Sequence, residues 1–479
     1  MTLIRQTLAD VLSVLAPGWQ LAGAPDVFVR GVSVDSRQVP EGGMFVALRG
    51  EHRDGHDFIA SAFAGGAALA LSNRPVEGYT TLDTRGAPPE SFSLPAVLVV
   101  DDPLTSMQAL AGAHRARCGG LRVVAVTGSM GKTSVKEAIA AVLEQAGPTL
   151  KSAGNQNNEI GLPLTLFNLD GSQRYAVLEM GMYALGEIEL LARLAQLHVG
   201  VVLNVAPIHL VRLGTIERIA QAKSELVCSL GADGVAILNN DDARVRAMNE
   251  LTRARVLTYG LTPAADLWAD QVRVHGLEGV SLVMHTDRQA FRQVRGTFNL
   301  NLQLLGSFAA YTALAAAAVG LSEGLGWEQI QAGMNSLGYG LRLVPEPGIR
   351  GITILNDAYN ANPRSVMAAL DVLKGLKGRR IAVLGDMLEL AGEEATGHRA
   401  VGTHAAGSAD VLLTLGEASL GMAEAAHAAG LREVHSYQNI DELRSALLEL
   451  VTAGDFVLIK GSHSLGMERL VQALQEVPR

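Results

Sequence analysis

Residues 123–136 read VVAVTGSMGKTSVK, and this stretch decides the fold around it. It opens with an apolar run typical of a buried strand and passes through a glycine-rich turn into a helix-forming segment. Two glycines let backbone N–H groups approach a polyphosphate, Lys132 supplies a cation, and the hydroxyl of Thr133 can reach Mg²⁺. The motif departs from the general phosphate-loop pattern G-x-x-x-x-G-K-[ST], because Val126 stands five positions before Gly131, where that pattern has glycine. It is therefore the shorter TGSxGKT form. We therefore predict a nucleoside triphosphate site formed by Thr127, Gly128, Ser129, Met130, Gly131, Lys132, Thr133 and Ser134.

Composition narrows the class of protein. The chain has 479 residues, of which 48% are hydrophobic and 18% charged, as expected for a globular protein of two to four domains. A formal charge of −9, without any run of lysine or arginine, argues against a nucleic-acid footprint. Two cysteines, Cys118 and Cys228, indicate a reducing compartment, and we predict both as buried thiols. Arg5 and Asp10 interrupt any secretory apolar core, so a cytoplasmic protein is expected.

Residues 296–322 carry no charge and have the length of a membrane span. Asparagine and glutamine dilute the first half, and alanine, which favours helix but contributes little to insertion, dominates the second. We predict a tightly packed buried helix and no membrane insertion.

Three domains of α/β class follow from the pattern of strands and helices. Residues 1–102 form a small α/β cap with short strands. Residues 103–340 alternate apolar strands with helices, as in a parallel sheet, and 266–298 alternate in strand fashion as an antiparallel annex. Residues 341–479 repeat the alternation as a domain of dinucleotide-fold type. The predicted strands of the second and third domains include 123–126, 176–178, 199–204, 235–238, 352–355, 380–384, 411–415 and 456–459.

Polar residues follow several of these strands, where ligands bind in parallel sheets. Glu179 comes directly after 176–178, and a carboxylate there can join Thr133 and a nucleotide in a Mg²⁺ site. His209 follows 199–204, although a lone histidine is more often structural. Lys223 falls on a predicted helix, where an exposed lysine is the ordinary interpretation. In the third domain the loops 356–363 (NDAYNANP) and 385–394 (GDMLELAGEE) also lie at strand carboxyl ends.

Taken together, these segments resemble the Mur ligase family of ATP-dependent amide-forming enzymes of peptidoglycan precursor synthesis, over nearly the whole chain. TGSMGKTS resembles the family's ATP loop, NQNNEIGLP (155–163) its substrate-facing loop, and EMGMYALGEI (179–188) its magnesium segment. IHL and AKSEL resemble its second-metal and lysine segments. EMG, DAYNANP, LGDMLEL with His398, and KGS (460–462) are similar to the members that add D-Ala-D-Ala. VSVDSRQVPEGGMFVALRGEHRDGHDFI (32–59) is similar to the family's UDP-sugar module.

The resemblance implies roles for particular residues. Lys132, His209 and Lys223 would be catalytic, and Arg342 and Asp357 would join the ATP loop in binding nucleotide. Two Mg²⁺ ions are expected, held by Thr133, Glu179, His209 and Lys223, the last as a carbamate. The UDP-sugar and peptide substrates would meet Ser33, Asp35, Ser36, Arg37, Asp54, Gly55, His56, Asn155, Asn157, Asn158, Tyr359, Asn360 and Asn362.

The implied reaction joins D-Ala-D-Ala to UDP-N-acetylmuramoyl-tripeptide through an acyl phosphate made from ATP, in a protein expected to be a monomer. One alternative is a sister ligase that adds a single amino acid, which DAYNANP and EMG oppose. Another is a nucleotide-hydrolysing switch or binding protein, which would have no use for a UDP-sugar module and would carry a base-recognition motif such as NKxD.

Four segments depart from the family pattern. Val211 stands where glutamate is usual, and His463 follows the Lys-Gly-Ser segment where arginine or asparagine is common. Gly340, Leu341 and Arg342 replace an adjacent Gly-Arg pair. In the adenine-contacting stretch, Phe308 and Thr312 replace histidine and asparagine, so we expect weaker base selectivity, because an amide hydrogen bond is lost.

Overall fold

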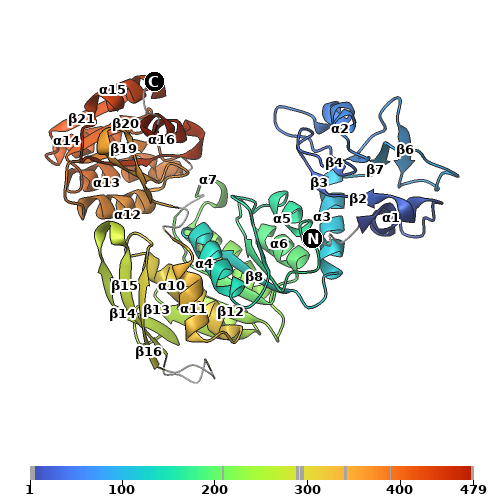
Figure 1. Cartoon of the computed structure of the whole chain (residues 1–479), viewed down its shortest axis with the longest axis horizontal. Coiled ribbons are helices and arrows are strands. Elements are labelled where there is room, and N and C mark those ends of the chain that lie inside the picture. The colour runs from blue at the N-terminus through green and yellow to red at the C-terminus, as the bar shows by residue number, and fades with distance from the viewer. Residues whose placement is uncertain are drawn as a thin grey trace.

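The computed structural model describes residues 6–207, 210–286, 291, 296–338, 342–388 and 390–475. These residues form three α/β domains in a row, with the N-terminal domain at one end, the central domain between, and the C-terminal domain at the other end (Figure 1). This confirms the predicted fold class. The boundaries at 102/103 and 340/341 stay predictions. Helix α3 (Pro103–Ala116) contributes residues to the apolar cores of both the first and the second domain.

The N-terminal domain contains a five-stranded parallel sheet of order β3-β4-β5-β7-β6. Strand β1 leads into α1, whose first turn is capped by Thr7 and Asp10, and pairs antiparallel with β2, which follows the helix. The elements are β1 (Gln6–Thr7), α1 (Leu8–Leu15), β2 (Phe28–Val29), β3 (Val32–Ser33), β4 (Met44–Val46), α2 (Ile59–Ala64), β5 (Leu69–Ser72), β6 (Thr80–Asp83) and β7 (Ala96–Val99).

The central domain is built on a nine-stranded sheet of order β16-β15-β14-β13-β12-β11-β8-β10-β9. The strands from β8 to β14 pair parallel, and β15 pairs antiparallel with both β14 and β16, which confirms the predicted annex. The strands are β8 (Arg122–Thr127), β9 (Thr149–Lys151), β10 (Tyr175–Glu179), β11 (Val199–Val202), β12 (Val235–Asn239), β13 (Arg255–Gly260), β14 (Leu267–Val274), β15 (Val280–Thr286) and β16 (Gly296–Leu302).

Helices cover both faces of the central sheet and bury two apolar cores. One face carries α4 (Lys132–Glu144), α10 (Ala309–Ser322) and α11 (Trp327–Asn335). The other carries α3, α5 (Gly161–Leu166), α6 (Glu187–Ala195) and α8 (Ile216–Cys228), with the short α7 (Leu210–Leu213) and α9 (Ala243–Ala247) in connections.

Helix α10 is buried almost all round, as its alanine-rich sequence predicts. A Cβ added at Gly320 would lie 2.8 Å from Val142 of α4, so the small side chains allow close packing of the two helices. Within the described residues, no helix is both long and apolar enough to cross a membrane. The uncharged stretch 296–322 is thus strand β16 followed by this packed helix.

The C-terminal domain has a six-stranded sheet of order β17-β18-β22-β19-β20-β21, parallel except for β17. Helices α12, α13 and α14 cover one face, and α15 and α16 the other. The elements are β17 (Val344–Pro347), β18 (Thr353–Asn356), α12 (Pro363–Lys374), β19 (Arg380–Gly385), α13 (Glu394–Ala406), β20 (Val411–Leu415), α14 (Leu420–Ala428), β21 (Glu433–Tyr437), α15 (Ile440–Leu450), β22 (Phe456–Lys460) and α16 (Glu468–Gln475).

The two cysteines differ in their exposure to solvent. Cys118 is buried as predicted, whereas the prediction for Cys228 was wrong, because this residue ends helix α8 on an exposed face.

Candidate active site

The phosphate loop, residues 127–134, joins strand β8 to helix α4. Gly131 caps the helix with φ of 84°, a left-handed conformation that favours glycine. At Gly128 a Cβ would lie 2.8 Å from the side chain of Leu203, so the loop passes too close to its neighbour for a larger residue. The backbone of the loop therefore requires glycine at both positions. The N-terminus of a 13-residue helix faces the loop.

The exit of strand β11 fixes the tip of this loop. Asn204 accepts a hydrogen bond from the Met130 N–H (2.9 Å) and donates one to the Met130 carbonyl (3.0 Å). Ser129 Oγ accepts from the Ala206 N–H at 2.8 Å. Long-range contacts therefore hold the loop in place, and Asn204, which sequence reasoning missed, supplies two of them.

Lys132 lies in the loop with its Nζ 3.0 Å from the Gly128 carbonyl oxygen. Burial lowers the pKa of this ammonium, the Glu179 carboxylate raises it, and Arg342 lowers it further. Arg342 belongs to the C-terminal domain, so two cations from two domains lie within electrostatic reach of each other. A polyphosphate is the kind of ligand that would relieve their repulsion.

Glu179 ends strand β10 and is almost fully buried. Its carboxylate accepts hydrogen bonds from Thr133 Oγ1 (3.0 Å) and Asn157 Nδ2 (2.8 Å). The structure thus brings together three residues predicted from separate segments. Their oxygen donors, beside a phosphate loop, suit Mg²⁺, which takes one or two carboxylates together with phosphate oxygens and water. No group of three or more His, Cys, Asp or Glu side chains with metal-ligand spacing occurs among the described residues.

The other two predicted asparagines behave differently. Asn158 accepts from the backbone N–H groups of Ile160 and Gly161 and so shapes the start of α5, whereas Asn155 is exposed.

Lys223 is buried on helix α8 at 2% exposure. No hydrogen bond or ion pair of its amine occurs within the described part of the chain. Burial, and then the charge of Lys132, hold the pKa of Lys223 well below its ordinary value. Both effects favour the neutral form of its amine. His209 lies outside the described residues. Its role as a metal ligand together with Lys223 therefore stays a prediction.

The loop 356–363 of the C-terminal domain is tied to the end of strand β22. Lys460 Nζ donates to Asp357 Oδ2 (2.6 Å) and to the Asn360 carbonyl (2.7 Å). Asn362 caps helix α12 by accepting from the Ser365 N–H at 3.0 Å. Lys460 is a second residue that sequence reasoning left without a role. Its place in the Lys-Gly-Ser segment, after a buried strand, was the available signal.

Tyr359 contacts the side chains of Arg342 and His463 in this loop region. The Arg342 guanidinium sits 4.2 Å from the Tyr359 ring centroid, and the His463 ring lies 5.1 Å from it on the same domain. Burial raises the pKa of Tyr359, Arg342 lowers it, and Glu179 of the central domain raises it. The loop therefore faces the magnesium segment across the domain boundary.

The N-terminal polar group consists of Ser33, Asp35, Ser36, Arg37, Asp54, Gly55 and His56. Asp35 and Arg37 form an exposed ion pair (2.7 Å), which lowers the pKa of Asp35 to about 2. Asp54 caps the turn at His56 and pairs with Arg74 at 3.0 Å, while His56 Nδ1 lies 2.9 Å from Ser72 Oγ. The group follows the carboxyl ends of adjacent parallel strands in its own domain, apart from the phosphate loop (Figure 1).

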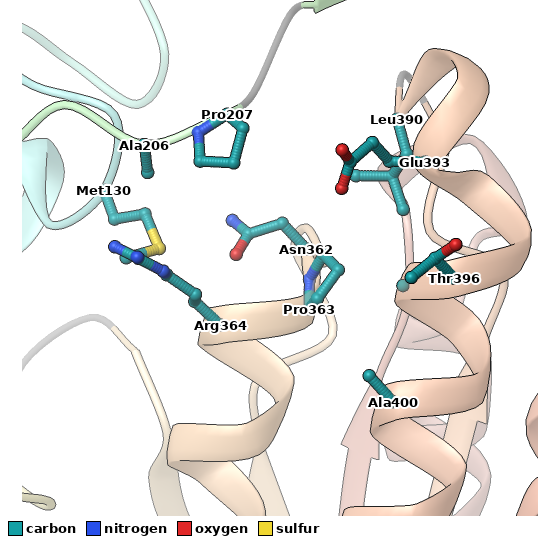
Figure 2. A pocket seen from close by; sticks show the side chains of 11 residues that line it. Met130, Ala206, Pro207, Asn362, Pro363, Arg364, Leu390, Glu393, Thr396 and Ala400 are labelled. Carbon is teal, nitrogen blue, oxygen red and sulfur yellow. The ribbon is translucent and has the colours of Figure 1, made fainter. Parts of the chain in front are cut away.

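A pocket of about 190 Å³ separates the phosphate loop from the C-terminal domain. Met130, Ala206 and Pro207 line its central-domain wall, and helices α12 and α13 form the opposite side (Figure 2). Asn362 was predicted here, but Arg364 was not, although it directly follows NDAYNANP. We call this cavity the interdomain pocket.

At the start of helix α10, Phe308 is 52% exposed and Thr312 is 7% exposed. The Phe308 ring is thus free to contact a ligand, whereas the Thr312 hydroxyl is largely enclosed.

Comparisons with known proteins agree with this geometry. Three family models match successive parts of the chain, namely "Mur ligase family, catalytic domain" over residues 28–111, "Mur ligase middle domain" over 126–320, and "Mur ligase, glutamate ligase domain" over 341–463. The chain is 34% identical to the UDP-N-acetylmuramoyl-tripeptide--D-alanyl-D-alanine ligase of Bacillus subtilis, covering 99% of this chain and 100% of the relative. It is 35% identical to the ligase of the same name from Escherichia coli, covering 99% of both chains. A crystal structure of MurF from Acinetobacter baumannii matches with a TM-score of 0.83 at 28% identity over 99% of both chains.

Proposed function

The chain belongs to the Mur ligase family, and on this basis we propose that it joins D-Ala-D-Ala to UDP-N-acetylmuramoyl-tripeptide with ATP, giving the pentapeptide, ADP and phosphate. The observation that carries this proposal within the structure is the contact of Thr133 and Asn157 with Glu179 beside Lys132. The full-length relatives that bear this activity in their names favour it over a sister ligase.

The proposed chemistry proceeds in two steps. A carboxylate is a poor acyl donor because its leaving group would be oxide, so an oxygen of the tripeptide carboxylate first attacks the γ-phosphorus of ATP and ADP leaves. The amine of D-Ala-D-Ala then attacks the carbonyl carbon of the acyl phosphate. The amide C–N bond forms, the C–O bond to phosphate breaks, and the amine loses a proton.

The chain supplies cationic groups for the phosphoryl transfer. Lys132 and the N-terminus of α4 stabilise the negative charge on the transferring phosphoryl group, and Arg342 approaches from the C-terminal domain. Glu179 and Thr133 would hold a Mg²⁺ ion against the phosphates, and this ion would offset further charge when bound. We assign Asp357 to the nucleotide and Tyr359, Asn360 and Asn362 to the peptide substrate.

Lys223 fits a second metal position as a carbamate. The neutral form of its amine, which the lowered pKa of Lys223 favours, can attack CO₂, forming an N–C bond and releasing one proton, so that a buried amine becomes an oxygen anion. His209 would join it as a ligand. The N-terminal polar group would bind the uridine and pyrophosphate. The monomeric state and the cytoplasmic location stay predictions.

Phosphate release from ATP, measured with each substrate omitted in turn, tests the proposed function. We expect release only when UDP-tripeptide and D-Ala-D-Ala are both present, with pentapeptide formed in equal amount. Rapid hydrolysis of nucleotide without them would instead support a switch. Efficient turnover with a single amino acid in place of the dipeptide would support a sister ligase.

A further inference from the structure

We propose that the interdomain pocket binds the carboxylate end of D-Ala-D-Ala, with Arg364 as the residue that recognises the carboxylate. This inference rests on the proposed function and deepens it, because it assigns the dipeptide to one cavity and its terminal charge to one side chain.

The pocket has the size and lining that a small dipeptide requires. Its volume is about 190 Å³, and part of its lining consists of small or apolar side chains, among them Ala206, Pro207, Pro363 and Ala400. Such a wall suits two methyl groups.

Helix packing sets the width of the pocket. A Cβ added at Gly397 of α13 would lie 2.9 Å from Pro363 of α12 and 3.2 Å from Leu390, so the two helices approach closely where these residues line the cavity. A large side chain on a substrate would meet this contact. The pocket therefore fits alanine better than a bulky amino acid.

Two charged side chains of the pocket, Arg364 and Glu393, orient the bound dipeptide. Figure 2 shows Arg364 extending from α12 toward Met130, while Glu393 lies across the pocket at the start of α13. Neither side chain has a hydrogen bond or ion pair among the residues that the structure describes. A carboxylate is attracted to the Arg364 side and repelled from the Glu393 side, so the two charges together favour one direction of binding.

The pocket lies next to the phosphate loop, where the reaction takes place. Met130 belongs to the phosphate loop, and Ala206 is hydrogen-bonded to Ser129 of that loop at 2.8 Å. Asn362, which caps α12 on the opposite wall, donates no side-chain hydrogen bond to any residue that the structure describes. A dipeptide anchored here thus lies beside the loop that handles the γ-phosphate, and a guanidinium is suited to bidentate binding of its carboxylate.

The test combines an enzyme variant with a modified substrate. Arg364→Gln should raise the KM for D-Ala-D-Ala about 10- to 100-fold, the effect of losing a charge-assisted hydrogen bond, while the KM values for ATP and UDP-tripeptide stay unchanged. Wild-type enzyme should disfavour D-Ala-D-Ala amide, which lacks the carboxylate, by a similar factor. Arg364→Gln should lose most of that discrimination.

Arg399→Gln is the matched control, because Arg399 is an exposed arginine on α13 that lines a different cavity. It should leave every KM unchanged. Ala400→Leu, which adds bulk on an exposed helix position inside the interdomain pocket, should also raise the KM for the dipeptide selectively.

Each other outcome has a distinct meaning. If Arg364→Gln keeps full discrimination against the amide, the carboxylate binds elsewhere and the inference is wrong. If it lowers kcat at saturating dipeptide and raises the KM for ATP, Arg364 binds the phosphoryl group instead, which also overturns it. Failure of the wild type to use D-Ala-D-Ala at all would refute the proposed function, and this result is distinguishable from both.

Discussion

The phosphate loop and the N-terminal polar group hold their polar side chains in different ways. The loop is fixed by residues far away in sequence, since Asn204 binds Met130 and Glu179 binds Thr133. In the N-terminal group, the Asp35–Arg37 pair links residues only two positions apart and is exposed. The loop is thus set before a ligand arrives, whereas a local surface pair can exchange partners with a ligand at low cost.

The largest expected effect comes from removing the cation of the loop. Lys132→Ala should lower the rate of ligation by at least about 10³-fold, because the lysine ammonium would no longer stabilise the negative charge on the transferring phosphoryl group. Thermal unfolding should stay close to wild type, since the helix does not need this side chain. Lys151→Ala, an exposed lysine at the end of β9, serves as control for phosphate-release assays. Near-wild-type turnover by Lys132→Ala would remove the role assigned to the loop.

Lys223→Ala should be nearly as damaging, with an expected loss of about 10²- to 10³-fold if a carbamate oxygen is required for a metal ion. Short carboxylates such as acetate should restore part of the activity by supplying an oxygen ligand in the space left behind. The assay is ligation at increasing carboxylate concentration. Full activity of the variant without any additive would count against the carbamate.

Asn204→Ala tests whether long-range contacts set the loop. Losing two hydrogen bonds, each worth about 1 kcal/mol, should lower kcat/KM for ATP roughly 10- to 30-fold and leave the KM for UDP-tripeptide unchanged. Asn335→Ala, at an exposed position ending α11, is the control. An unaltered ATP dependence would mean that the loop keeps its shape without Asn204.

Arg37→Ala tests whether the local ion pair of the N-terminal polar group is available to a ligand. The KM for UDP-tripeptide should rise about tenfold, because a charge-assisted contact to the ligand is lost. The free energy of unfolding should not change measurably, since Arg37 is highly exposed. A clear drop in melting temperature with an unchanged KM would show that the pair is structural.

The smallest effect concerns the nucleotide base. With Phe308 exposed and Thr312 largely enclosed, purines can stack, but selectivity should be relaxed by roughly 0.5 to 1.5 kcal/mol, a few-fold to tenfold. Thr312→Asn should increase the ratio of kcat/KM for ATP over GTP. A wild type that already rejects GTP by several orders of magnitude would overturn this expectation, as would an unchanged ratio in the variant.

Sequence patterns predicted the strands that are buried and apolar, such as β20 (Val411–Leu415), and the antiparallel annex. They missed strands at sheet edges, where the side chains are only partly buried, as in β21 (Glu433–Tyr437) and β17 (Val344–Pro347). Strand β5 (Leu69–Ser72) was also missed, although it is fully buried, because it lies in an alanine-rich stretch that favours helix. Local preference was overridden there by pairing with β4 and β7.

For the site, the sequence predicted residues whose position follows from a strand end, such as Glu179 and Asp357. It could not predict Asn204 as a clamp on Met130, or Arg364 as a wall of the interdomain pocket. Both roles depend on which segments meet in space. The pKa of Lys223 likewise depends on burial against neighbours, and a helical lysine in sequence would ordinarily be exposed.

The acyl phosphate is the central claim, and oxygen transfer tests it most directly. UDP-tripeptide labelled with ¹⁸O in both oxygens of the reacting carboxylate is converted with ATP and D-Ala-D-Ala, and the released phosphate is analysed by mass spectrometry. The account predicts one ¹⁸O atom in each phosphate and one in the new amide, because the bridging oxygen leaves with phosphorus. Phosphate without label, formed together with pentapeptide, would contradict it.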